Sequence, residues 1–190
     1  MIRLSLRVKF KVLGVPYLWP ESDPNSASYI DLRREPDRIG ELPELHRWPV
    51  LRATVELLNS PSGQFRSIGC EHVASEWGPA AEAVQYCGYV GYCWANNDWN
   101  QDVLHYYAHF RRLSQFVNES PQLRTAADGT SVIFEPLQTA YREANFVGWG
   151  VDYWFQGIGE SEAAARVRAE PGLLALRSFV QLENECLRAL

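Results

Sequence analysis

An aromatic, glycine-containing phrase occurs twice in this chain of 190 residues. Tyr89-Val90-Gly91-Tyr92-Cys93-Trp94 returns as Phe146-Val147-Gly148-Trp149-Gly150-Val151. Aromatic and β-branched residues suit a pleated, half-buried surface, and a glycine among them lets another backbone or ring approach closely. A helical pattern follows each copy. The repeat therefore predicts two related strand-to-helix units, at 84–118 and 141–180, and does not by itself indicate any chemistry.

The first residues alternate between apolar and polar side chains, as a strand with one buried face does. The apolar set is Ile2, Leu4, Leu6, Val8, Phe10 and Val12, and the opposite set is Arg3, Ser5, Arg7, Lys9 and Lys11. This pattern predicts a strand with one exposed, basic face.

Proline dominates the segment 13–49, which holds six of the 11 prolines. Proline fixes φ and has no N–H donor, so neither a long helix nor a central strand can pass through the segment. We expect it to be irregular, with a short edge strand at Tyr29–Arg33 as its most regular part.

The other patterns complete an α+β prediction. Leu51–Asn59 and Gln64–Ala74 are predicted as a hairpin across Ser60-Pro61-Ser62-Gly63, and strands are predicted at 84–95, 131–141 and 145–156. Pro136 would place its strand at an edge or a bulge.

Two helices follow the aromatic strands. Asp98 and Gln101 form a capping box ahead of an apolar stripe made by Val103, Tyr106, Phe110, Leu113 and Val117. Ser161 caps the second helix, in which Pro171 either starts a separate helix or makes a kink. We expect a mainly antiparallel sheet with two or three helices packed on one face.

Composition indicates one folded domain over 1–190. The hydrophobic fraction is 46% and there are 7 tryptophans, which is typical of a globule with a substantial core. The chain has no apolar run of membrane-spanning length and no signal-peptide pattern, so a cytoplasmic location is expected. A strong excess of arginine over lysine favours a GC-rich, bacterial source.

The formal net charge of −5 argues against a nucleic acid partner, because a phosphate backbone requires concentrated positive charge. It is compatible with a basic protein partner. The four cysteines match no zinc spacing and contain no Cys-x-x-Cys pair, so reduced, mostly buried thiols are expected.

Three groups of residues suggest chemistry only weakly. His105 and His109 have the spacing of two metal ligands on one helix, but they lack a third ligand, and boundary histidines are the favoured interpretation. Cys70 and His72 share a strand face without any further sign of thiol catalysis. The basic row is best interpreted as a solvated face, partly paired with Glu56 or Glu71.

Because no catalytic constellation emerges, the sequence favours a non-catalytic domain that binds a protein, such as an immunity or antitoxin-like neutraliser of a basic toxin or effector. The expected contact residues are the acids at the two helix starts and two nearby aromatic anchors: Asp98, Asp102, Glu160, Glu162, Trp99 and Trp154. No metal or cofactor is expected. One alternative is an enzyme or small-ligand binder with an aromatic pocket between sheet and helices. The other alternative is a structural component of a phage or secretion assembly.

Overall fold

The computed structural model describes residues 2–15, 30–78, 82–125, 129–141 and 145–186. The strands are β1 (Arg3–Leu6), β2 (Lys9–Val15), β3 (Phe65–Trp77), β4 (Ala83–Trp94), β5 (Ser131–Tyr141) and β6 (Phe146–Gly159). The α-helices are α1 (Pro49–Leu58), α2 (Val103–Glu119), α3 (Pro121–Thr125) and α4 (Glu162–Cys186). Three short 3₁₀ helices are η1 (Pro36–Glu41), η2 (Pro43–Leu45) and η3 (Asn97–Asn100).

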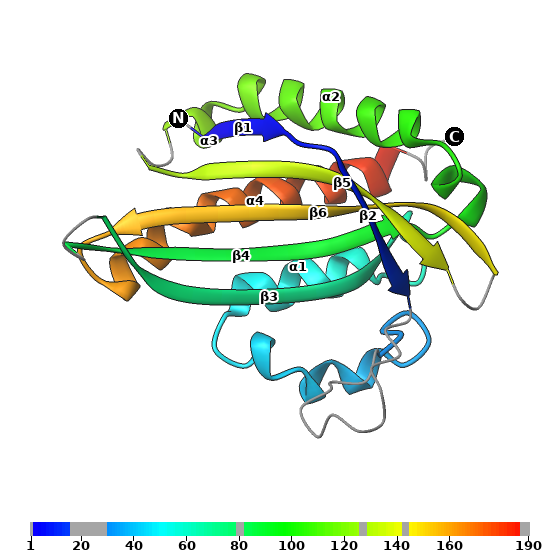
Figure 1. The fold of residues 1–190 in the computed structure, drawn as a ribbon, viewed down its shortest axis with the longest axis horizontal. Helices are drawn as coiled ribbons and strands as arrows, with labels where there is room; N and C mark the ends of the chain where they lie inside the picture. The colour runs from blue at the N-terminus through cyan, green and yellow to red at the C-terminus, as the bar shows by residue number, and fades with distance from the viewer. Residues whose placement is uncertain (1, 16–29, 79–81, 126–128, 142–144, 187–190) are drawn as a thin grey trace.

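All six strands form one mixed sheet, in the order β1-β5-β6-β4-β3, with β2 also on β5 (Figure 1). The β3–β4 and β5–β6 pairs are antiparallel, and β4 and β6 join them through a third antiparallel ladder. Only β1 and β2 run parallel to their neighbour. The expected α+β fold with a mainly antiparallel sheet is therefore confirmed.

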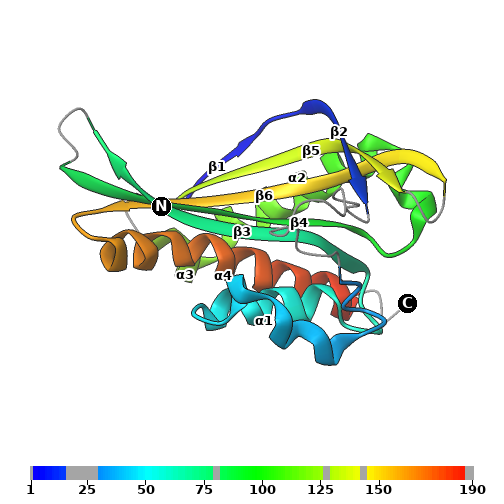
Figure 2. The ribbon, with the colours of Figure 1, turned by 60° about the horizontal axis from the view of Figure 1, so that its bottom comes forward.

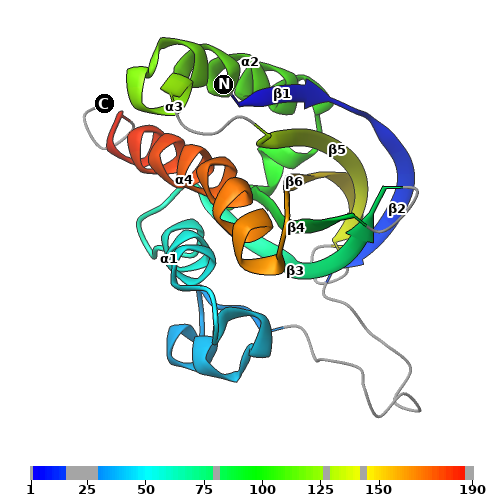
Figure 3. The same cartoon turned by 90° about the vertical axis from the view of Figure 1, so that its left-hand side faces the viewer.

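The helices α1, α2 and α4 lie on one side of the sheet (Figure 3). Figure 2 shows α4 running along the sheet with α1 packed against it, and α1 also contacts β3. The main core fills the space between these layers, and its largest buried side chains include Trp48, Trp94, Tyr92, Tyr106, Tyr153, Phe134, Phe155 and Phe179. On the other side of the sheet the described residues form no helix, and we call this side the helix-free face.

Two glycines let α4 approach β6 closely. A Cβ on Gly157 would lie 2.4 Å from the backbone oxygen of Ala165, and one on Gly159 would lie 2.6 Å from the nitrogen of that same residue. Both distances are far shorter than van der Waals contact. The glycines at the end of β6 therefore fix how near the helix packs to the sheet.

The N-terminal strand differs in part from its prediction. It is interrupted between β1 and β2, and Leu6 is 42% exposed although its alternation predicts burial. The interruption lies opposite Pro136, because β1 pairs as far as Phe134 and β2 begins its pairing at Leu137. A proline cannot donate to a ladder, so the gap falls where a hydrogen bond is missing. Pro136 itself lies inside the sheet, beside an interrupted neighbour.

Two predicted strands are wrong. Leu51–Asn59 lies almost wholly in α1, so it does not pair with the strand that follows; Leu51, Thr54, Val55 and Leu58 are buried at helical spacing behind Pro49. Of the short strand predicted at Tyr29–Arg33, Tyr29 lies outside the described residues. Ile30–Arg33 leads into a turn in which Asp31 accepts from the backbone N–H of Arg33.

The predicted capping box is also wrong. Asp98 lies within η3, and the side chain that caps α2 is that of Asp102, which accepts from the backbone N–H of Leu104 at 2.8 Å. The helix begins later than predicted because η3 comes first and is held in place by Asn100. The buried amide of Asn100 bonds both the N–H and the carbonyl of Trp94. The predicted Ser161 cap is confirmed, since its Oγ accepts from Ala164.

Both members of the proposed repeat are strands followed by helices, and β4 and β6 are antiparallel neighbours. The first aromatic phrase lies at the end of β4, whereas the second lies at the beginning of β6. Structural equivalence of the two units remains a prediction.

Candidate functional site

Two acidic side chains meet on the helix-free face. Glu135 on β5 pairs with Asp152 on β6 across the strands, so their side chains share one face. Glu135 is fully buried, and Asp152 is partly buried. Burial, and next the charge of Glu135, raise the pKa of Asp152 from 3.8 to about 7, although Lys9 acts in the opposite direction. Asp152 is therefore a carboxyl group that holds its proton close to neutral pH.

Two cations, Arg7 between β1 and β2 and Lys9 at the start of β2, provide positive charge beside the buried carboxylate of Glu135. The Nζ of Lys9 lies 2.5 Å from Oε2 of Glu135, and a guanidinium nitrogen of Arg7 lies 3.6 Å from Oε1. This corrects the expectation that Glu56 or Glu71 pairs with the basic row. Glu56 instead bonds Arg52 within α1. The side chain of Lys11 lies outside the described residues.

Trp154 is fixed in the middle of this face. Its Nε1 donates to Oε2 of Glu135 at 3.0 Å. The ring lies 4.9 Å from that of Tyr89, centroid to centroid, and the ammonium of Lys9 lies 5.5 Å from the ring centroid. A hydrogen bond at one edge and contacts on the ring leave the indole little freedom to rotate.

A hollow of about 320 Å³ lies beside Trp154. Its lining consists of Arg7, Lys9, Cys87, Ser131, Ile133, Trp154 and Gln156. Ser131 on β5 pairs with Gln156 on β6, and Gln156 pairs with Cys87 on β4. These three lining residues therefore lie in one row across the sheet. Burial raises the pKa of Cys87, so its thiol stays protonated and is a poor nucleophile.

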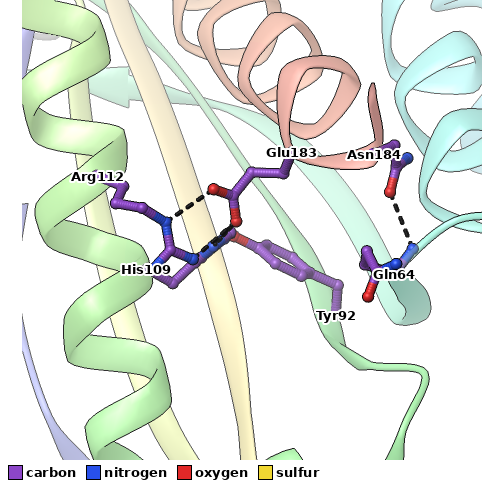
Figure 4. Close-up of polar contacts among 6 residues, drawn as sticks. All are labelled: Gln64, Tyr92, His109, Arg112, Glu183 and Asn184. Carbon is purple, nitrogen blue, oxygen red and sulfur yellow. Dashed lines mark hydrogen bonds and ion pairs between the residues drawn. The ribbon is translucent and has the colours of Figure 1, made fainter. Parts of the chain in front are cut away.

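A second polar cluster lies on the other side of the sheet, between α2, α4 and β4 (Figure 4). His109 is fully buried, with Nε2 3.0 Å from the hydroxyl of Tyr92 and Nδ1 3.3 Å from Glu183. Arg112 bonds the same Glu183 carboxylate through two nitrogens, each at 2.8 Å. Nearby, Asn184 accepts from the backbone N–H of Gln64, which ties the end of α4 to the start of β3.

The direction of the hydrogen bonds that join Tyr92, His109 and Glu183 follows from the charge states of these residues. Burial lowers the pKa of His109, so the ring is neutral. Burial alone would raise the pKa of Glu183, but hydrogen bonds from His109 and Arg112 outweigh it and lower the pKa to about 2. The neutral ring then donates through Nδ1 to Glu183 and accepts from Tyr92 at Nε2.

The hydrogen-bonded series Tyr92–His109–Glu183 is connected as a catalytic relay would be, but it has no access to a substrate. Tyr92 is fully buried, and desolvation raises the pKa of its hydroxyl well above the ordinary value. A group that neither ionises nor meets solvent cannot serve as a nucleophile. The cluster holds two helices to the sheet.

Cys70 and His72, the pair considered from the sequence as a thiol site, are also unsuited to catalysis. Both ring nitrogens of His72 are engaged, one by the hydroxyl of Tyr86 at 2.7 Å and the other by the carbonyl of Glu44 at 2.9 Å. Desolvation raises the pKa of Cys70 to about 12. The four cysteines are free, but only Cys93 is buried, whereas Cys70 and Cys87 are partly buried and Cys186 is exposed, so the expectation of mostly buried thiols is not met.

His105 and His109 do not converge on a metal. His105 stacks on Trp99, whereas His109 points into the core toward Glu183. Within the ranges that the structure describes, no three side chains of the metal-binding types gather around one point.

The six predicted contact residues lie in three places. Asp98, Trp99 and Asp102 follow the end of β4, which lies beside the start of β6. Glu160 and Glu162 follow the other end of β6, about 40 Å away at a strand rise of roughly 3.3 Å per residue. Trp154 lies between these ends on the helix-free face. Of the six, only Trp154 belongs to the hollow and its surroundings.

Sequence reasoning missed Glu135 and Asp152. Each is a single acid inside a strand of otherwise apolar and aromatic residues, in Phe134-Glu135-Pro136 and Val151-Asp152-Tyr153. Acids are rare inside buried strands, and this rarity could have drawn attention to both residues.

No family model, curated protein or solved structure matches this chain. In the described part of the chain, no helix has both the length and the apolar composition required to cross a bilayer.

Proposed function

We propose that this protein is a non-catalytic binding domain and that a partner protein docks on the helix-free face of the sheet, around Trp154. The observation that carries the proposal is the fixed, half-buried indole of Trp154 beside an open hollow. Tryptophan and arginine dominate the energetics of protein interfaces, and a side chain already held in place loses little entropy on binding.

The neighbouring residues support such an interface. Around Trp154 lie partly exposed apolar groups, Ile133 and Tyr89, with Val73 57% exposed at the edge strand. Arg7, Lys9 and Gln156 form a polar border. An apolar centre with a polar rim is the common anatomy of a protein interface. Neutralisation of a toxin or effector is one form that such binding takes, and here it is supported by composition alone.

A small-ligand binder is the second candidate. The hollow of 320 Å³ lies near the lower end of the range for ligand pockets, which is about 300–1,000 Å³. It lies on the helix-free face, not between sheet and helices as the sequence suggested. Its size suits a side chain better than a drug-sized molecule, which favours the protein-binding proposal.

The test compares two tryptophans that the sequence ranked equally. A partner captured from native lysate is purified, and its Kd is measured for the wild type, Trp154→Ala and Trp99→Ala, with circular dichroism as the folding control. Loss of the anchor at Trp154 should weaken binding about 30-fold or more, whereas Trp99→Ala should change Kd less than about 3-fold. The reverse ranking would move the interface to the end of the sheet, and turnover of a substrate would overturn the non-catalytic reading.

A further inference from the structure

The groups that line the hollow are mainly hydrogen-bond donors. Gln85 donates from its Nε2 to Oε1 of Gln156 at 2.9 Å, so the group that Gln156 offers to a ligand is its own NH₂. Ser131 adds a hydroxyl. Arg7 has five N–H donors, and its side chain is 60% exposed with an ion-pair contact of 3.6 Å to Glu135. A hollow with this lining suits an acceptor.

The described lining of the hollow contains two cations and no acid, although the whole chain carries −5 and Glu71 lies farther across this face, opposite Tyr89. The cations facing the hollow are Arg7 and Lys9, with the exposed Arg3 at the neighbouring position beside Ser131. Glu135 matches one of them, because Lys9 approaches it at 2.5 Å. Asp152 shares its row and is held partly protonated near neutral pH by burial. Among the described residues, the single carboxylate of Glu135 pairs with both Arg7 and Lys9, which leaves an excess of one positive charge at the lining of the hollow.

Ile133 and Trp154, paired across β5 and β6, give the hollow an apolar part. A ligand that fits both parts has an anionic head and a short apolar stem. The strand segment Ser131–Phe134 is paired with β1 on one side and β6 on the other, so its backbone N–H groups cannot form the nest that captures a chain-terminal carboxylate. These features favour a side-chain carboxylate.

We infer that the hollow receives the carboxylate of a Glu or Asp side chain on an acidic segment of the partner protein, with Arg7 as the main ligand-binding cation. This inference rests on the proposed function and reverses the charge of the partner expected from composition. Net charge describes the whole chain, whereas docking depends on the charge of the contacted face.

Benzoate is the probe, because it joins a carboxylate to a flat apolar group, and benzamide is its neutral control. We expect saturable NMR shifts of the Trp154 indole N–H and the Gln156 side-chain amide on addition of benzoate, and no saturable shift with benzamide. Arg7→Gln should weaken benzoate binding at least 5-fold, while Arg177→Gln on the outer side of α4 leaves it unchanged. Arg7 is preferred to Lys9 for this test because removal of Lys9 would leave Glu135 without its closest cation.

Equal binding of benzamide, or unchanged benzoate binding by Arg7→Gln, would overturn the carboxylate inference. The purified partner separates this failure from failure of the docking proposal. If Trp154→Ala abolishes partner binding while Arg7→Gln leaves it intact, the face is the interface but the inferred acidic contact is wrong. If benzoate binds as expected and partner affinity is unchanged by both variants, the site takes carboxylates and the docking proposal is wrong.

Discussion

Glu135 and Asp152 stand opposite each other on β5 and β6, and each has a buried carboxylate oxygen without a hydrogen-bond partner among the described residues. Two acids in this position repel each other when both are charged. Lys9 and Trp154 contact Glu135 and stabilise its negative charge. The negative charge of Asp152 is stabilised less, so Asp152 holds its proton.

This pair predicts a pH dependence of stability. The pKa of Asp152 is about 7 in the folded protein against an ordinary 3.8, so between these values the folded state binds the proton more tightly than the unfolded state does. Its contribution to the free energy of unfolding therefore falls as pH rises from about 4 to 7, and then levels off. Asp152→Asn should be more stable than the wild type at pH 8.5 by about 1–3 kcal/mol, with a much smaller difference at pH 4.5. Urea unfolding at both pH values checks this, and an equal difference at both would contradict it.

Glu183 predicts the opposite slope at acidic pH. Its folded-state pKa is about 2 against an ordinary 4.5, so its contribution is complete above pH 4.5 and is lost as pH falls toward 2. Glu183→Gln should lower the free energy of unfolding by about 2 kcal/mol at pH 7, after allowance for partial solvent screening. The difference should shrink as pH approaches 2. The control is Glu185→Gln, an exposed change that keeps an oxygen able to accept from Gln181 and should have little effect.

The start of α2 offers a matched pair of aspartates. Asp102→Ala should cost about 1 kcal/mol, because the N–H of Leu104 loses its acceptor. Asp98→Ala removes only a 3.4 Å contact with Gln101 on the surface and should cost less than about 0.5 kcal/mol. Thermal or urea unfolding of the two variants checks this. The capping box predicted from the sequence would instead make Asp98→Ala the more destabilising of the two substitutions.

The contact between α4 and β6 predicts a large steric effect. Gly157→Ala places a Cβ against the backbone of Ala165 and Ala169 and should cost about 3 kcal/mol or more. Gly40→Ala is the control, because a Cβ there meets nothing within 4 Å. Similar unfolding midpoints for the two variants would show that the helix does not pack this closely.

Hydrophobic periodicity predicted correctly the elements whose pattern fits only a strand or only a helix. The strands at 131–141 and 145–156 and the apolar stripe of the helix after Asp102 are confirmed. Leu51–Asn59 failed because a short apolar run fits a buried strand and a helix equally, and the turn residues after it resemble a hairpin connection. His109 extends the stripe of α2 into the core, since Glu183 and Tyr92 satisfy both its nitrogens.

The candidate site was less predictable than the fold. Trp154 could be named from its residue type, but its partner Glu135 depends on the pairing of β5 with β6 and of β2 with β5. The interaction of Lys9 with Glu135 joins residues far apart in the chain. Such contacts follow from strand order, which local patterns do not specify.

The most direct test of the docking face is photo-crosslinking from two exposed valines. Val73 shares the row of Cys87 and Gln156 on the helix-free face and is 57% exposed, whereas Val167 on α4 is 67% exposed. Benzoylphenylalanine placed at each position gives two variants with similar exposure on different surfaces. With the purified partner, crosslinking from position 73 and none from position 167 is the predicted result. Crosslinking from position 167 alone would contradict the proposal that the helix-free face binds the partner.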